Sequence, residues 1–182
     1  MSDPVSITPR FRRSVRLDTD FASATAIDGF HCPASFQAAV TFMAAHIADT
    51  EQGAFTWTGP YGGGKSSLAV ALACLFGAPK PIREKAASLF GAVQLAELLD
   101  LSVSSSTSDI LTEIERRTKD RGLLLIMDEL GRGLEAAADG EGDLHLLQDI
   151  AELAARSQGR FIFLGILHQA FEEYAERLGR KA

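Results

Sequence analysis

A glycine-rich stretch that ends in a lysine and a serine is the part of the sequence best suited to chemistry. It fits the pattern G-x-x-x-x-G-K-[ST] without a mismatch and reads Gly59-Pro60-Tyr61-Gly62-Gly63-Gly64-Lys65-Ser66, followed by Ser67. Glycines accept positive φ angles, so several main-chain N–H groups can turn inward around a phosphate chain at the positive end of a helix. We therefore predict that residues 59–67 bind a nucleoside triphosphate, with Lys65 on its β- and γ-phosphates and the Ser66 hydroxyl on Mg²⁺. Ser67 either assists or simply begins the helix.

Two adjacent carboxylates, Asp128 and Glu129, follow the apolar run Leu123–Met127. A continuous apolar run of this length is typical of a parallel strand buried on both faces, and ligands of parallel sheets bind beyond the carboxyl ends of the strands. We predict that Asp128 joins Ser66 as a Mg²⁺ partner. Glu129 is predicted to orient and polarise an attacking water, unless it is merely the first surface residue after the strand.

Apolar patterns predict three strands, the first leading into the glycine-rich stretch and the second into the carboxylates. Helices are predicted where apolar residues recur at spacings of three and four. The predicted strands cover residues 54–58, 123–127 and 161–166, and the predicted helices cover 33–48, 65–76, 81–99, 108–121, 143–157 and 171–178. Residues 101–103 are a weak edge strand or a linker, and the glycine-rich residues 131–142 are expected to be a loop. Strands that alternate with helices predict an α/β fold, a three-layer sandwich in which helices flank a mostly parallel sheet.

The two motifs together resemble those of P-loop ATPases that carry an additional catalytic glutamate, the group that includes AAA+ and STAND-type NTPases. The resemblance rests on GPYGGGKSS at 59–67 and LLLIMDE at 123–129, and more loosely on the strand at 161–166. In that group a further strand lies between the two motif strands, and a polar residue at its end senses the γ-phosphate. The resemblance therefore implies a catalytic role for His168, with Gln169 as a substitute. The plain alternative for His168 is a strand-end histidine held by hydrogen bonds.

Further roles are implied by the same resemblance. The place where such ATPases often hold adenine falls on Ile27 and Phe30, and arginines that act on a neighbouring subunit's nucleotide correspond to Arg132 and to Arg177 or Arg180. The ordinary alternatives are a core position for the apolar pair and a solvated surface for the arginines. The sequence around the motifs also resembles the ATPase module at the start of large bacterial proteins, some of them linked to phage defence. The usual fifth strand and helical lid are not found, so the resemblance implies an incomplete core or a fragment of a longer protein.

The composition is that of a folded globular domain. Of the 182 residues, 46% are hydrophobic and 23% are charged, and the formal net charge is −6. This acidic balance argues against a surface that binds nucleic acid as a whole. Cys32 and Cys74 are far apart and not spaced as metal ligands, which favours a reduced, cytoplasmic setting. No stretch resembles a signal peptide or reaches the ~20 apolar residues of a membrane-spanning helix, so no membrane partner is expected.

The first residues are expected to form a basic arm ahead of the core. Four arginines between Arg10 and Arg16 stand against a single acid, Asp3, in this part of the sequence. We predict an arm over residues 1–20 and a P-loop NTPase core over residues 21–182. The arm is either a solvated terminus or a docking segment for an acidic partner or nucleic acid.

The leading functional hypothesis is a module that binds and hydrolyses ATP with Mg²⁺ and couples its nucleotide state to a partner protein, a further domain or another subunit of a homo-oligomer. A small-molecule kinase of the P-loop type is the second hypothesis. It is less favoured because no arginine-rich lid segment follows the third predicted strand, and because the Asp128-Glu129 pair suits activation of water better. The third is a module that binds nucleotide without hydrolysing it. A GTP switch is disfavoured, since the sequence has no N-K-x-D motif.

Overall fold

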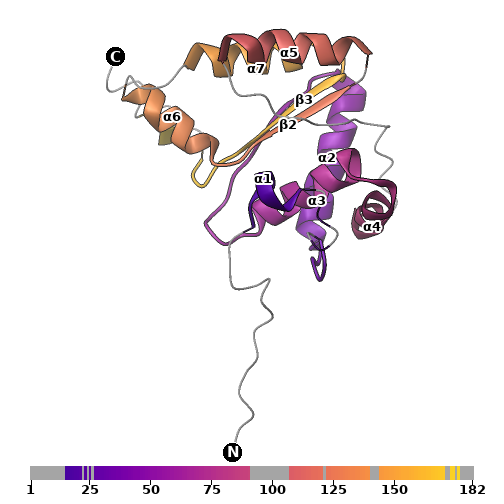
Figure 1. Ribbon diagram of the computed structural model, residues 1–182. Coiled ribbons are helices and arrows are strands. Elements are labelled where there is room, and N and C mark those ends of the chain that lie inside the picture. The colour runs from indigo at the N-terminus through magenta and orange to yellow at the C-terminus, as the bar shows by residue number, and fades with distance from the viewer. Residues whose placement is uncertain are drawn as a thin grey trace, which may run out of the picture.

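The computed structural model describes residues 15–21, 23, 25, 27–90, 107–120, 122–139, 144–170, 173–174 and 176. In these parts of the chain, three parallel strands form one sheet with helices on both faces (Figure 1). The strands are β1 (Ala54–Trp57), β2 (Leu123–Met127) and β3 (Phe161–Ile166), and their order in the sheet is β1-β3-β2. The predicted α/β class is confirmed, and so is the prediction that the third strand lies between the other two.

Burial differs among the strands because of their places in the sheet. β3 pairs with β1 on one side and with β2 on the other, and it is buried over its whole length. Among the described residues β2 pairs only with β3, so Leu123 and Leu124 are buried whereas Leu125–Met127 keep partial exposure. The predicted burial on both faces is therefore complete for Leu123 and Leu124 but only partial for Leu125–Met127.

The helices largely match the predicted ranges. They are α1 (Leu17–Asp20), α2 (Ala34–Thr50), α3 (Lys65–Gly77), α4 (Lys80–Phe90), α5 (Thr107–Asp120), α6 (Leu130–Ala138) and α7 (Leu144–Arg156). The predicted continuation of α4 to residue 99, the weak strand at 101–103 and most of the helix predicted at 171–178 lie outside the described residues. Within the described ranges, no helix has the length and apolar character needed to cross a membrane.

Alternate residues of β3 point to opposite faces of the sheet and join two separate core clusters. Ile162 and Leu164 belong to a first core cluster with residues of α2, α3 and α4. Phe161 and Phe163 belong to a second core cluster with residues of α5, α6 and α7. Figure 1 shows the same division, with α1 to α4 on one side of the strands and α5 to α7 on the other. The carboxyl ends of the strands lie between these two helical layers (Figure 1).

Helix α6 occupies much of the stretch 131–142, so the loop predicted there is wrong. The glycines at 131 and 133 suggested a loop, because glycine inside a helix costs about 0.5–1 kcal/mol relative to alanine. Leu130 and Leu134 are one helical turn apart and are almost fully buried in the second core cluster, with 4% and 3% of their surface exposed. Burying each leucine stabilises the fold by about 1.5–3 kcal/mol, which outweighs the glycine penalty.

The described part of the predicted basic arm packs on the core. Val15 and Leu17 contact the first core cluster, and α1 lies against α3. The main-chain N–H of Arg16 donates to the Asp20 carboxylate at 2.9 Å, across the turn of α1. Residues 15–20 therefore belong with the core and not with an arm that ends at residue 20, while residues 1–14 lie outside the described ranges.

Candidate functional site

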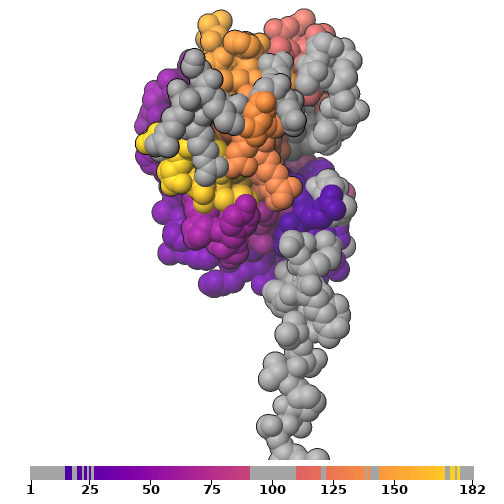
Figure 2. All heavy atoms as spheres, turned by 90° about the vertical axis from the view of Figure 1, so that its left-hand side faces the viewer, coloured from indigo at the N-terminus to yellow at the C-terminus, as the bar shows by residue number. Residues whose placement is uncertain are grey.

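The carboxyl ends of the three strands meet at one edge of the sheet, beside a cavity of about 1040 Å³. β1 leads into a glycine loop (residues 59–64), β2 into a carboxylate turn (residues 128–129) and β3 into His168. Residues from all three segments line the cavity, and its size is that of clefts which hold small-molecule ligands. On the face shown in Figure 2, the yellow segment after β3 adjoins the orange of α6 and the magenta of α3.

The glycine loop turns its main chain toward the cavity. Gly62 and Gly64 have φ angles of 75° and 81°, a left-handed conformation that glycine adopts without steric cost. Gly64 is also the N-cap of α3, so the loop leads directly to the positive end of that helix. A Cβ atom at Gly62 would meet no atom within 4 Å, which means that a ligand can approach the main chain closely at this point. This geometry suits an anion held by main-chain N–H groups.

Lys65 stands at the start of α3 with only 8% of its surface exposed. Its ammonium group donates to the main-chain oxygens of Gly59 at 2.6 Å and Pro60 at 2.8 Å. Burial lowers the pKa of Lys65 from its ordinary value, and the charge of Asp128 acts in the opposite direction. These two loop oxygens hold the ammonium in the cavity wall, within electrostatic reach of the carboxylate turn.

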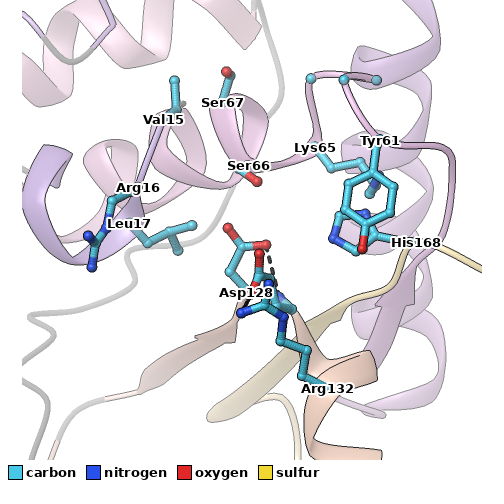
Figure 3. A pocket seen from close by; sticks show the side chains of 14 residues that line it. Val15, Arg16, Leu17, Tyr61, Lys65, Ser66, Ser67, Asp128, Arg132 and His168 are labelled. Atoms are coloured by element: carbon cyan, nitrogen blue, oxygen red, sulfur yellow. Dashed lines mark hydrogen bonds and ion pairs between the residues drawn. The ribbon is translucent and has the colours of Figure 1, made fainter. Parts of the chain in front are cut away.

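Ser66 and Asp128 point toward each other across the cavity (Figure 3). The Asp128 carboxylate accepts the main-chain N–H of Glu129 at 3.0 Å, which fixes its direction. Mg²⁺ is commonly held by one or two carboxylates together with phosphate oxygens and water. Among the described residues no group of three or more His, Cys, Asp or Glu side chains could hold a metal. Ser66 and Asp128 together offer one hydroxyl and one carboxylate, so a Mg²⁺ ion at this point would need phosphate oxygens and water for the rest of its coordination.

Glu129 combines a strained backbone with an exposed ion pair. Its φ of 57° puts a residue with a Cβ atom in the left-handed region, which is uncommon outside glycine. One of its carboxylate oxygens lies 2.9 Å from a guanidinium nitrogen of Arg132, and the two side chains are 43% and 78% exposed. Both residues line the cavity. Arg132 is a candidate for contacting a neighbouring subunit's nucleotide, but here it contacts the predicted catalytic glutamate of its own chain.

His168 faces the glycine loop and stacks on Tyr61. The two rings are 3.6 Å apart between centroids, with an angle of 18° between their planes. Both ring nitrogens of His168 are buried, and neither has a hydrogen-bond partner within the described structure. The plain prediction of a strand-end histidine held by hydrogen bonds is therefore wrong. Leaving a buried polar atom unpaired costs about 1–3 kcal/mol, so the arrangement needs a reason beyond folding.

The remaining predicted residues divide between the cavity and the core. Ser67 lines the cavity, whereas Gly59 and Pro60 contribute through their contacts with Lys65. The adenine contact predicted for Ile27 is wrong, because this side chain is 1% exposed in the first core cluster, and Phe30 packs against the same cluster. The candidate arginines at 177 and 180 lie outside the described residues.

Sequence reasoning missed the N-terminal wall of the cavity. Val15, Arg16 and Leu17 line it on the side of Ser67, away from Tyr61 and His168 (Figure 3). No local pattern marks these three residues, because they reach the cavity only through the packing of α1 on α3. The basic character of this segment was the one visible signal, and it was assigned to the arm.

Comparisons with protein-family models, curated proteins and solved structures found no match to this chain.

Proposed function

We propose that this chain is a P-loop nucleoside triphosphatase module that binds ATP with Mg²⁺ and hydrolyses it. The observation that carries the proposal is the meeting of the glycine loop and the carboxylate turn on one cavity, with Asp128 close enough to favour the charged form of Lys65. A main-chain anion cradle beside a hydroxyl and a carboxylate is the donor set that a magnesium–triphosphate complex requires. The strand order β1-β3-β2 supports the resemblance to ATPases with an additional catalytic glutamate.

Each side chain then has a defined task in hydrolysis. The loop N–H groups and the Lys65 ammonium bind the phosphate oxygens, and Ser66 and Asp128 hold the metal. When bound, Mg²⁺ supplies positive charge that offsets the charge developing on the phosphates. Glu129 orients a water molecule whose oxygen forms a bond to the γ-phosphorus while the bond to the ADP oxygen breaks, and the carboxylate accepts the proton that the water loses.

The proposal also covers the partners of the protein and its location in the cell. A nucleotide-dependent change around the cavity would act on a partner protein, a further domain or another subunit, in a cytoplasmic location where ATP is available. His168 would contact the γ-phosphate. Nucleic acid is a candidate effector through the arginines between Arg10 and Arg16, of which only Arg16 lies within the described residues.

A second candidate function is favoured by one observation, the ion pair between Glu129 and Arg132. A carboxylate that is engaged by a guanidinium group is less available to polarise water. In this alternative the module binds MgATP and changes its contacts, but does not release phosphate. Measuring phosphate release by the unaltered chain separates the two candidates, because only the first predicts turnover.

The proposed function is tested by replacing Lys65 with alanine and titrating MgATP. Hydrogen bonds to a charged group contribute about 1.5–3 kcal/mol, so Lys65→Ala is expected to weaken MgATP binding roughly 10- to 100-fold. Lys80→Ala is the matched control, since Lys80 is an exposed lysine in α4 that pairs only loosely with Glu84 at 3.8 Å. Isothermal calorimetry, with and without EDTA, measures both affinities and the dependence on Mg²⁺.

Unchanged MgATP affinity in Lys65→Ala would contradict the proposed function. Equal losses in Lys65→Ala and Lys80→Ala would also contradict it, because they would indicate a general effect of charge. Binding that survives removal of divalent cations would overturn the metal role of Ser66 and Asp128 while leaving the anion cradle in place.

A further inference from the structure

Tyr61 is an exposed aromatic residue at the tip of the glycine loop. Its side chain is 76% exposed, yet its ring lies almost flat on His168 at the end of β3. A tyrosine so open to solvent contributes little to the core. The stack instead affects His168, because the Tyr61 ring limits the rotation of the imidazole and its access to water (Figure 3).

The second observation is the state of the His168 nitrogens. An imidazole always carries at least one N–H donor, and here both ring nitrogens are buried without a partner within the described structure. Buried polar atoms without partners are rare in folded proteins, and each one calls for an explanation such as strain, a catalytic role or a bound water or ion. His168 also lines the cavity, so a ligand inside the cavity can supply the missing partner.

The position of the stack indicates which part of a ligand it faces. Tyr61, Lys65 and His168 gather at one end of the cavity, whereas Val15 and Ser67 lie at the other (Figure 3). Lys65 is the residue assigned to the β- and γ-phosphates, so the end that holds His168 is the terminal-phosphate end.

A second pair of the same kind serves as an internal comparison. Phe42 in α2 is 70% exposed and stacks on His46, with a ring angle of 24° and a longer centroid distance of 5.9 Å. His46 also contacts Phe55 edge-on at 5.8 Å, so its ring is held by two aromatic neighbours. This pair does not line the cavity. The Phe42–His46 pair therefore has an exposed aromatic residue stacked on a histidine, as in the Tyr61–His168 pair, but lies away from the cavity.

We propose that Tyr61 is a positioning residue, whose ring holds His168 with an N–H group directed at the terminal phosphate of the bound nucleotide. The inference rests on the proposed function and deepens it, because it gives the site a means to distinguish a triphosphate from a diphosphate. Tyr61 acts through His168 and through the shape of its ring. Its hydroxyl group is not required.

The test compares the dissociation constants for MgATP and MgADP in the full chain and five variants. Tyr61→Leu is expected to lower the preference for MgATP over MgADP about tenfold, the size of one hydrogen bond to a charged group. Tyr61→Phe keeps the ring and should keep the preference. His168→Leu should lose it to the same extent, and the double variant Tyr61→Leu/His168→Leu should be no worse than His168→Leu alone. Phe42→Leu is the matched control and should leave the preference unchanged.

Several results would overturn the inference. One is a Tyr61→Leu variant with the preference of the unaltered chain, and another is an equal loss of affinity for both nucleotides, which would indicate a merely structural role. Additive effects in the double variant would show that Tyr61 does not act through His168. If His168→Leu does not fold, His168→Asn replaces it in the cycle. Failure of the unaltered chain to bind MgATP would overturn the proposed function together with the inference, whereas binding with unaffected variants would overturn the inference alone.

Discussion

The glycine loop and the carboxylate turn reach the same cavity by the same backbone device, but with different residues. Each follows a parallel strand and leads into a helix through a residue in the left-handed conformation that immediately precedes the helix. In the loop this residue is Gly64, with a φ of 81°, and in the turn it is Glu129, with a φ of 57°. Glycine adopts this conformation freely, whereas an L-residue with a side chain loses about 1–2 kcal/mol.

The difference shows where the main chain suffices and where a side chain is needed. An anion cradle uses only main-chain N–H groups, so position 64 needs no side chain and glycine can adopt the left-handed conformation there without strain. The turn must present a carboxylate, and the strain at Glu129 is compensated by the burial of Leu130 and Leu134 directly after it. Glu51 and Gln158 also have positive φ angles, but of these three residues only Glu129 lines the cavity, so its place beside the cavity and not its φ angle points to a chemical role.

Glu129→Gln gives the largest expected effect on the carboxylate side of this comparison. The amide keeps the size of the side chain but cannot accept a proton from water, so ATP turnover should fall by about 10²- to 10⁴-fold. MgATP affinity should stay close to that of the unaltered chain, because the loop and Ser66 are untouched. Phosphate release and calorimetric titration measure the two quantities, with the exposed α5 residue Glu115→Gln as control. If Glu129→Gln hydrolyses ATP at the unaltered rate, Glu129 has no role in hydrolysis, and catalysis does not explain its left-handed backbone.

Gly64→Ala addresses the loop side and is expected to have a smaller effect. The new Cβ atom would lie 3.3 Å from the Phe36 ring in a left-handed conformation, which costs about 1–2 kcal/mol in the free energy of unfolding. If the loop relaxes to relieve this strain, its N–H groups lose their common direction and MgATP affinity falls about tenfold. Urea unfolding and calorimetry test both parts.

Gly133→Ala is the matched glycine variant for that experiment. Gly133 lies in α6, where a Cβ atom would meet nothing within 4 Å, so alanine should raise the free energy of unfolding by about 0.5–1 kcal/mol. A Gly64→Ala protein as stable as the unaltered chain, and with equal affinity, would show that the left-handed turn is not needed for the cradle.

The sequence predicted the parts of this molecule that depend on local order. The predicted strands match the observed ones within one residue, because residues 54–58 alternate before Gly59 and residues 123–127 and 161–166 are apolar runs. The loop is predictable because its pattern is contiguous from Gly59 to Ser66. The meeting of Asp128 with the loop followed from the rule that parallel strands end at the same edge of a sheet.

Features that depend on packing between distant segments were missed. The sequence predicts a loop where helix α6 lies, because the burial of Leu130 and Leu134 cannot be seen in a stretch that also holds two glycines. The stack of Tyr61 on His168 joins residues far apart in the chain, and the N-terminal wall of the cavity depends on how α1 packs against α3. Propensity and spacing carry no information on these contacts.

The smallest change in the free energy of unfolding is expected for Glu129→Gly, which tests directly whether the backbone at Glu129 is strained. Glu129→Gly relieves the left-handed penalty but adds the backbone freedom of glycine to the unfolded chain, so the free energy of unfolding should rise by only about 0.5–1 kcal/mol. Loss of the exposed pair with Arg132 changes this little, since surface ion pairs contribute about 0–1 kcal/mol. Glu51→Gly is the control, because Glu51 has a φ of 60° at the end of α2, outside the cavity. Both variants should gain stability in urea unfolding, but only Glu129→Gly should lose ATP turnover. Destabilisation by Glu129→Gly alone would mean that the carboxylate supports the fold, and that the turn differs from the glycine loop for a structural reason.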